Sequence, residues 1–176
     1  AEPLMGKLFQ FRFGEGTELT GHSFGNLFIA AMTQVTGDFD AAIKESSKVL
    51  AIRGSVVPST LDKASLVAKY IDGTETVGES NIPKTGRRIA QVSLRPADCK
   101  ATDDAIEAIR KADAIVLGPG SLYTSVMPNL LVGNIAKEII ASKAIKIYVC
   151  NVMTQKGETD GYKASDHLRA IINHAG

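Results

Sequence analysis

The sequence is short of several features that define large classes of proteins. Its 176 residues include 20 basic and 19 acidic side chains, for a net charge of +1, whereas a nucleic-acid binder needs a basic stripe. Its two cysteines, Cys99 and Cys150, are too few for a disulfide framework or a metal cluster. No stretch approaches the roughly 18 to 20 apolar residues of a membrane span, and no signal peptide is recognisable. We therefore predict a cytoplasmic protein that binds neither nucleic acid nor a membrane.

Familiar site fingerprints are absent as well. The chain has neither the spacing of a dinucleotide-binding G-x-G-x-x-G nor the lysine of a P-loop, which counts against a nicotinamide oxidoreductase and a P-loop nucleotidase. His22, His167 and His174 have no metal-ligand spacing, and a structural role is expected for the last two on a surface-type helix. Ser121 has no identifiable base nearby in sequence, so no hydrolase triad is argued. The sequence therefore assigns no catalytic residue and no metal ligand.

The most informative stretch is an apolar run, 114–117, that ends in Gly118-Pro119-Gly120-Ser121. A run without alternation is typical of a strand buried on both faces, and the glycines allow a sharp turn and a close approach to a ligand. Hydroxyl side chains follow, Thr124 among them, near the start of the next helix, where free amides and the helix dipole favour an anion. From this stretch alone, a phosphate-bearing ligand and a turn that simply needs small residues are equally compatible with the pattern.

A second polar loop, 151–161, follows the apolar strand 145–150. The β-α-β-α alternation after residue 102 predicts two parallel strands with a right-handed crossover, and ligands bind beyond the carboxyl ends of such strands. Side chains suited to reading a base, a ribose or a sugar are Asn151, Thr154 and Gln155. Side chains suited to a ribose hydroxyl or a hydrated magnesium are Glu158 and Asp160. A solvated surface loop is the alternative.

The first third of the chain is predicted to be helical. Helices are expected at 3–13, 24–35 and 38–50. The second is apolar nearly all round, so it should be buried, and the third should bury Phe39, Ile43, Val49 and Leu50. Polar groups at the entrance of the second helix either cap it and fill a core or present donors to a ligand: His22, Ser23 and Asn26.

The middle third is predicted to be an antiparallel sub-sheet, roughly 51–95. It contains a strand at 51–57, a hairpin of 64–71 and 74–78 around Asp72-Gly73, and an alternating strand at 88–94. Arg53 is an anion ligand by type or a solvated strand-edge arginine, and Glu79 is interpreted as an ordinary loop residue. Further helices are predicted at 102–111, from Pro128 to about 140, and at 165–174.

Three longer motifs, 19–27, 118–131 and 150–159, resemble the bacterial gluconeogenesis factor family. That family is related to the 2-phospho-L-lactate transferases that build the deazaflavin cofactor F420, and the resemblance covers about residues 8–176. It implies a single α/β domain with a Rossmann-like, three-layer fold and a mostly parallel sheet. It also implies a cytoplasmic protein that binds UDP-N-acetylglucosamine and regulates central carbon metabolism, cell shape and envelope synthesis.

In the transferase relatives the Gly-Pro motif lines the nucleotide and phosphate site, which corresponds here to residues 118–121, and Asn129 belongs to the same motif. Family members begin with a strand and a Gly-Gly-Gly-Thr-Gly loop, followed by a segment that supplies metal-binding aspartates in the transferases. Neither is present here, nor is the family's C-terminal portion. We therefore expect a fragment of a longer chain and carry over no metal ligand or catalytic residue.

The leading prediction is a nucleotide-sugar-binding regulator without established turnover. The alternatives are a transferase acting on a nucleotide-activated phosphoester, with magnesium expected only in that case, and a scaffold whose turns are purely structural. Association into a homo-oligomer is compatible with the sequence, which leaves the oligomeric state open. The predicted ligand-binding residues are His22, Ser23, Asn26, Gly118, Pro119, Gly120, Ser121, Thr124, Asn129, Asn151, Thr154 and Gln155.

Overall fold

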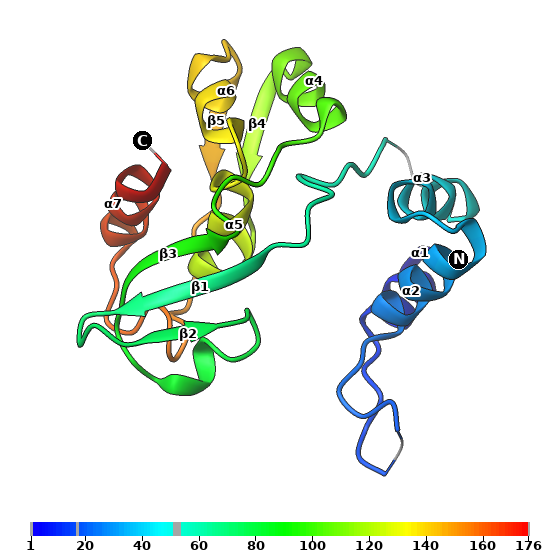
Figure 1. Cartoon of the computed structure of the whole chain (residues 1–176), viewed down its shortest axis with the longest axis horizontal. Coiled ribbons are helices and arrows are strands. Elements are labelled where there is room, and N and C mark those ends of the chain that lie inside the picture. The colour runs from blue at the N-terminus through cyan, green and yellow to red at the C-terminus, as the bar shows by residue number, and fades with distance from the viewer. Residues whose placement is uncertain (1, 17, 51–53, 176) are drawn as a thin grey trace. The chain divides into compact units, whose positions relative to one another are not determined.

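The structure is a computed structural model that describes residues 2–16, 18–50 and 54–175. The chain divides into two units, Ala1–Pro58 and Ser59–Gly176 (Figure 1). The first contains three helices, and the second contains all five strands that the described residues form. The predicted α/β class is confirmed.

Aromatic packing and well-formed caps build the first unit from α1 (Glu2–Gln10), α2 (Phe24–Thr36) and α3 (Phe39–Val49). The Phe9 ring packs edge-on against Phe24 and Phe28, at centroid distances of 5.5 and 5.4 Å. The Ser23 side chain caps α2, as expected for a serine before an apolar helix, by accepting a hydrogen bond from the Asn26 amide at 3.2 Å.

The burial predicted for these helices is wrong. No residue of α2 is buried, and Val35 is 80% exposed, because so short a unit has little chain with which to cover a helix that is apolar all round. In α3 the buried residues are Ala42 and Ser46, whereas Phe39 and Val49 are exposed and Ile43 and Leu50 are half-buried. Of the strand predicted at 51–57, residues 51–53, with Arg53, lie outside the described residues, and 54–57 form no strand.

The second unit begins with an antiparallel sheet in the order β2-β1-β3, made of β1 (Ser65–Tyr70), β2 (Glu75–Val77) and β3 (Ile89–Arg95). The predicted hairpin and the returning strand are therefore confirmed, over a narrower range than 51–95. A register shift pairs Lys69 with Gln91 and Tyr70 with Ile89, which leaves Ala90 unpaired. This bulge places Ile89 in phase with Val92 and Leu94, so all three are buried.

The predicted parallel strands are confirmed as β4 (Ala114–Leu117) and β5 (Ile145–Tyr148), which pair in register along their whole length. Figure 1 shows α4 (Asp103–Lys111) and α6 (Ile135–Ala141) next to this sheet. Arg110 of α4 donates two hydrogen bonds to the Glu138 carboxylate of α6, at 2.8 and 2.6 Å. This bidentate pair connects α4 to α6, a helix of the crossover between β4 and β5.

The expectation that these strands are buried on both faces is wrong for the described chain. Ile115 belongs to the core, while Val116 is 53% exposed and Ile145 and Ile147 are also exposed. Successive side chains of a strand point to opposite faces, and a two-stranded sheet has few neighbours to cover both. Cys150, two residues after β5, is half-buried.

The single helix predicted from Pro128 to about 140 is in fact interrupted. A π-helical turn, η2 (Leu122–Val126), leads into the short α5 (Met127–Leu130), and α6 starts only at Ile135. The break contains Gly133, which has φ +46 and whose Cβ, if present, would lie 2.9 Å from the Ala101 amide nitrogen. The positive φ takes the backbone out of the right-handed helical region, so the helix does not continue through Gly133, and the close approach of Ala101 requires glycine there.

A 3₁₀ turn, η1 (Pro83–Thr85), lies between β2 and β3. The last element is α7 (Ala164–Ala175), which corresponds closely to the helix predicted at 165–174. His167 of α7 is buried against expectation, and its Nδ1 atom lies 3.0 Å from the Tyr148 hydroxyl. The largest fully buried side chains of this unit are Tyr70, Ile82, Val92, Cys99, Leu122, Met127 and Thr159. No helix in the described ranges is long and apolar enough to cross a membrane.

Candidate functional site

The two polar loops predicted to carry the site start side by side, because β4 and β5 are parallel neighbours. Leu117 pairs with Tyr148, and the Val149 amide donates to the Leu117 carbonyl at 2.9 Å. Gly118 follows with φ +91, and a Cβ on it would lie 2.9 Å from the Val149 carbonyl oxygen. Glycine is therefore required where the first loop leaves the sheet, both for its backbone angle and for this close approach.

Side chains of the second loop hold the first loop in place. The Asn151 side-chain amide donates to the Gly120 carbonyl at 2.9 Å and to the Gln155 side-chain oxygen at 3.1 Å. The Gln155 side-chain amide in turn donates to the Ser121 hydroxyl oxygen at 2.7 Å. The structure thus joins four predicted site residues in one hydrogen-bond network across the two loops.

The backbone of the first loop leaves donors uncommitted. Within the described chain, the amides of Gly120 and Ser121 have no hydrogen-bond acceptor. The Ser121 carbonyl, by contrast, accepts from both Ser125 and Val126 at 2.9 Å, which produces the π-helical turn η2. Such turns are frequent at functional sites, and free amides before a helix suit an anion.

A buried carboxylate, Glu158, ties the second loop to the start of η2. It is 6% exposed and accepts hydrogen bonds from the Tyr123 amide at 3.2 Å and from the Thr124 hydroxyl at 2.9 Å. Its negative charge lies at the amino end of a helical segment, where the dipole favours it. The amide of Tyr123 is therefore not free for a ligand, and Glu158, considered from the sequence for a ribose hydroxyl or magnesium, bonds to protein groups instead.

Other residues of the second loop support its shape. Thr159 is fully buried, and its hydroxyl oxygen accepts a hydrogen bond from the backbone amide of Gln155 at 2.9 Å. The Asp160 carboxylate accepts one from the backbone amide of Gly157 at 2.7 Å. Thr154, a predicted ligand residue, is exposed and lies outside the network. In the described residues no three His, Cys, Asp or Glu side chains gather as a metal site, so no group of residues is assigned to magnesium.

Tyr123 of η2 and Tyr148 of β5 have raised pKa values. Burial raises the pKa of Tyr123, and the hydrogen bond to the Tyr162 hydroxyl, 2.8 Å away, raises it further. Burial, followed by the nearby Cys150 thiol, raises the pKa of Tyr148 to about 12. Both phenols therefore stay neutral at physiological pH and serve as hydrogen-bonding and packing groups.

A cavity of about 370 Å³ is lined in part by residues of η2 and α5. It is lined by two predicted residues, Thr124 and Asn129, and by Glu79, which the sequence interpretation treats as ordinary loop. The Asn129 side chain accepts from the Ser59 hydroxyl at 2.6 Å and donates to the Ser125 carbonyl at 2.8 Å. The position of Glu79 directly after a predicted strand is the one sequence signal that could have indicated that it lines a cavity.

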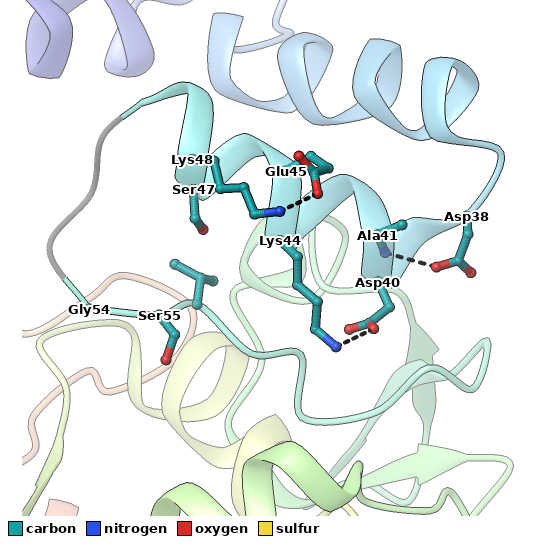
Figure 2. Close-up of a pocket in the computed structure, with 10 residues that line it drawn as sticks. Asp38, Asp40, Ala41, Lys44, Glu45, Ser47, Lys48, Gly54 and Ser55 are labelled. Carbon is teal, nitrogen blue, oxygen red and sulfur yellow. Dashed lines mark hydrogen bonds and ion pairs between the residues drawn. The ribbon is translucent and has the colours of Figure 1, made fainter.

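The three predicted residues of the first unit lie at the start of α2. His22 and Asn26 are exposed, and Ser23 is the cap already described. A cavity of about 580 Å³ in this unit lies along α3, and none of the three lines it. Figure 2 shows that its charged side chains are bonded locally: Lys44 to Asp40 at 2.8 Å, Lys48 to Glu45 at 2.6 Å, and Asp38 to the Ala41 amide. This hollow therefore offers a ligand little unpaired charge.

Comparison with known proteins assigns the family. The family described as 2-phospho-L-lactate transferase CofD matches residues 1–176, the whole chain. The chain belongs to the CofD family. Within this family it is 57% identical over 175 residues to a gluconeogenesis factor from Halalkalibacterium halodurans, and 52% identical over 175 residues to one from Bacillus subtilis. The resemblance to gluconeogenesis factors is confirmed.

The CofD-family fold is shared with a solved structure. A crystal structure of a Bacillus halodurans protein, of the same identity of 57%, superimposes with a TM-score of 0.90 over 100% of this chain and 57% of that one. The two alignments include 99% of this chain, but only 54% of the Halalkalibacterium relative and 55% of the Bacillus subtilis relative. It thus spans about half the length of the curated relatives that it matches.

Proposed function

We propose that this CofD-family chain contributes the nucleotide-sugar site of a gluconeogenesis factor, a regulator that binds UDP-N-acetylglucosamine without converting it. The regulated processes are carbon metabolism and cell shape during gluconeogenic growth. The relatives' name supports a role in gluconeogenesis, and the loops support the ligand class.

The observation that carries the proposal is the junction of the two loops at the carboxyl ends of β4 and β5. Parallel sheets bind ligands at this edge. The free backbone amides of Gly120 and Ser121 suit a diphosphate. The Asn151 side-chain oxygen and the second amide hydrogen of the Gln155 side chain remain available for a uracil or ribose. The residues already lie in a fixed arrangement, which lowers the entropy cost of binding.

Thermal melting with a ligand panel tests binding. The protein at its natural length is melted with UDP-N-acetylglucosamine, UDP, GDP or no nucleotide. A ligand that binds only the folded state at 100 times its Kd stabilises it by about 2.7 kcal/mol, which raises the melting temperature. We expect the largest shift with UDP-N-acetylglucosamine, and no shift with any nucleotide would refute the proposal and favour a scaffold.

Substitution locates the ligand. Ser121→Ala removes a hydroxyl of the network and should weaken binding, while Ser93→Ala, at an exposed position of β3, serves as a matched control. Both variants should fold. Equal affinity in the two variants would remove the first loop from the site.

A transferase reaction is the second candidate, because the family description names one. Incubation with a nucleotide-activated phospholactate donor, a deazaflavin acceptor and magnesium distinguishes the two functions. The regulator should give no coupled product above the protein-free control. Formation of the product would establish the transferase and overturn the proposed regulator.

A further inference from the structure

The cavity beside α5 differs in chemistry from the first loop, whose residues 118–121 form the glycine loop. Four hydroxyl side chains, one amide and one carboxylate line it: Ser59, Thr60, Ser65, Thr124, Asn129 and Glu79. No lysine or arginine is among its lining residues, so a phosphate has no cationic partner there. The cavity is therefore suited to the uncharged, hydroxyl-bearing part of a ligand.

One polar group of this cavity is uncommitted. Glu79 lines the cavity with an exposed side chain and has no hydrogen-bond or ion-pair partner in the part of the chain that the structure describes. An ionised carboxylate only accepts hydrogen bonds, and bonds to a charged acceptor are stronger than neutral ones. Two adjacent hydroxyls of a sugar ring are donors that match such an acceptor.

An apolar wall completes the cavity. Leu66, Leu94 and Val132 are buried core residues that line it, and Pro128 is half-buried. A volume of about 370 Å³ falls within the ordinary range of small-molecule pockets, which combine apolar walls with a few polar groups. The C–H face of a pyranose or an N-acetyl methyl group would pack on such a wall.

The cavity and the glycine loop are both adjacent to η2, which follows Ser121 directly and contributes Thr124 to the cavity lining. A Cβ on Gly120 would lie 3.1 Å from the Ser125 Cβ, and the Ser125 carbonyl accepts from Asn129, a lining residue. Thr124, another lining residue, is bonded to Glu158 of the second loop. A ligand with a phosphate at the loop and a sugar in the cavity would lie along η2.

We infer that this cavity is the sugar subsite of the nucleotide-sugar site, with Glu79 and Asn129 as the residues that recognise sugar hydroxyls. The inference rests on the proposed function and extends it from the nucleotide to the sugar. It assigns a binding role to Glu79, which lies some forty residues before the glycine loop in sequence.

Affinities for two probes, UDP and UDP-N-acetylglucosamine, test the subsite by calorimetry on the protein at its natural length. We expect the sugar nucleotide to bind at least about tenfold more tightly than UDP, the gain from one hydrogen bond to a charged group. Glu79→Gln and Asn129→Ala should each remove most of this ratio and leave the UDP affinity unchanged. The control Glu75→Gln, an equal loss of charge on β2 outside the cavity, should keep the ratio.

The failures are distinguishable. Equal binding of the two probes to the unsubstituted protein, or an unchanged ratio in both Glu79→Gln and Asn129→Ala, would overturn the sugar subsite while leaving nucleotide binding at the loops. Absence of binding by both probes would overturn the proposed function and the subsite together. Melting curves of each variant without ligand show that a lost ratio is not a lost fold.

Discussion

At the scale of single residues, glycine conformation sets the shape of the second loop. Gly157 has φ +80, and a Cβ on it would overlap the Pro83 carbonyl of η1. Gly161, in the same loop, has φ +73 with no atom within 4 Å of that position. The two glycines share a backbone conformation and differ only in available space.

This pair separates backbone strain from steric overlap. Gly161→Ala should lower the free energy of unfolding by about 1–2 kcal/mol, the cost of a left-handed residue with a side chain. Gly157→Ala should lower it by roughly 1–3 kcal/mol more, because Pro83 must move. Urea unfolding of both variants measures the difference, and equal losses would show that Gly157 and Pro83 do not pack as described.

The tyrosines provide a prediction for alkaline pH. A phenol ionises near pH 10 in an unfolded chain, whereas the pKa of Tyr148 is about 12 in the folded protein and that of Tyr123 is raised as well. Between these values the native state holds more protons than the unfolded state, so stability falls as pH rises above about 10. Absorbance titration should show delayed ionisation, and Tyr148→Phe should remove the step near 12. Ionisation of all tyrosines together near pH 10 while the protein is still folded would contradict the described burial.

At the scale of elements, Glu158 connects the second loop to η2. Glu158→Ala would leave the Tyr123 amide and the Thr124 hydroxyl without their acceptor in a buried place. We expect a loss of about 2–3 kcal/mol in the free energy of unfolding, in the range for buried unpaired polar groups. Glu107→Ala, which removes an exposed carboxylate paired with Lys111, should leave this free energy almost unchanged. Similar losses in both variants would argue against the buried bond.

Elements with local signals could be predicted from the sequence. The Asp72-Gly73 hairpin and the helices capped by Ser23, Asp38 and Thr102 form because turn and capping chemistry depend on neighbouring residues. The junction of the two polar loops also followed, because parallel strands bring their carboxyl ends to one edge.

Features that depend on distant contacts could not be predicted. The burial of α2 depends on how much chain covers it, and the helix break at Gly133 depends on Ala101, some thirty residues earlier. The commitment of Glu158 depends on Tyr123 and Thr124, which are separated from it by 35 and 34 residues. A carboxylate in a polar loop carries no local sign that it will be buried.

At the scale of the whole molecule, this chain corresponds to about half of a CofD-family protein. Each unit of the chain leaves apolar side chains exposed, such as Val35 on α2 and Val116 on β4. The relatives are about twice as long as this chain, so the substrates and partners of the whole protein stay proposals. Homo-oligomer formation likewise stays a prediction, and the cytoplasmic location does too.

The most direct test of the central claim is a two-dimensional amide NMR titration of the protein at its natural length with UDP-N-acetylglucosamine. We predict that the amide signals of Gly120 and Ser121, together with those of Asn151 and Gln155, shift in one saturable process. Signals from α3, beside the cavity in the first unit, should stay in place. Saturable shifts confined to α3, or none at all in the two loops at millimolar ligand, would contradict the claim that these loops bind the nucleotide sugar.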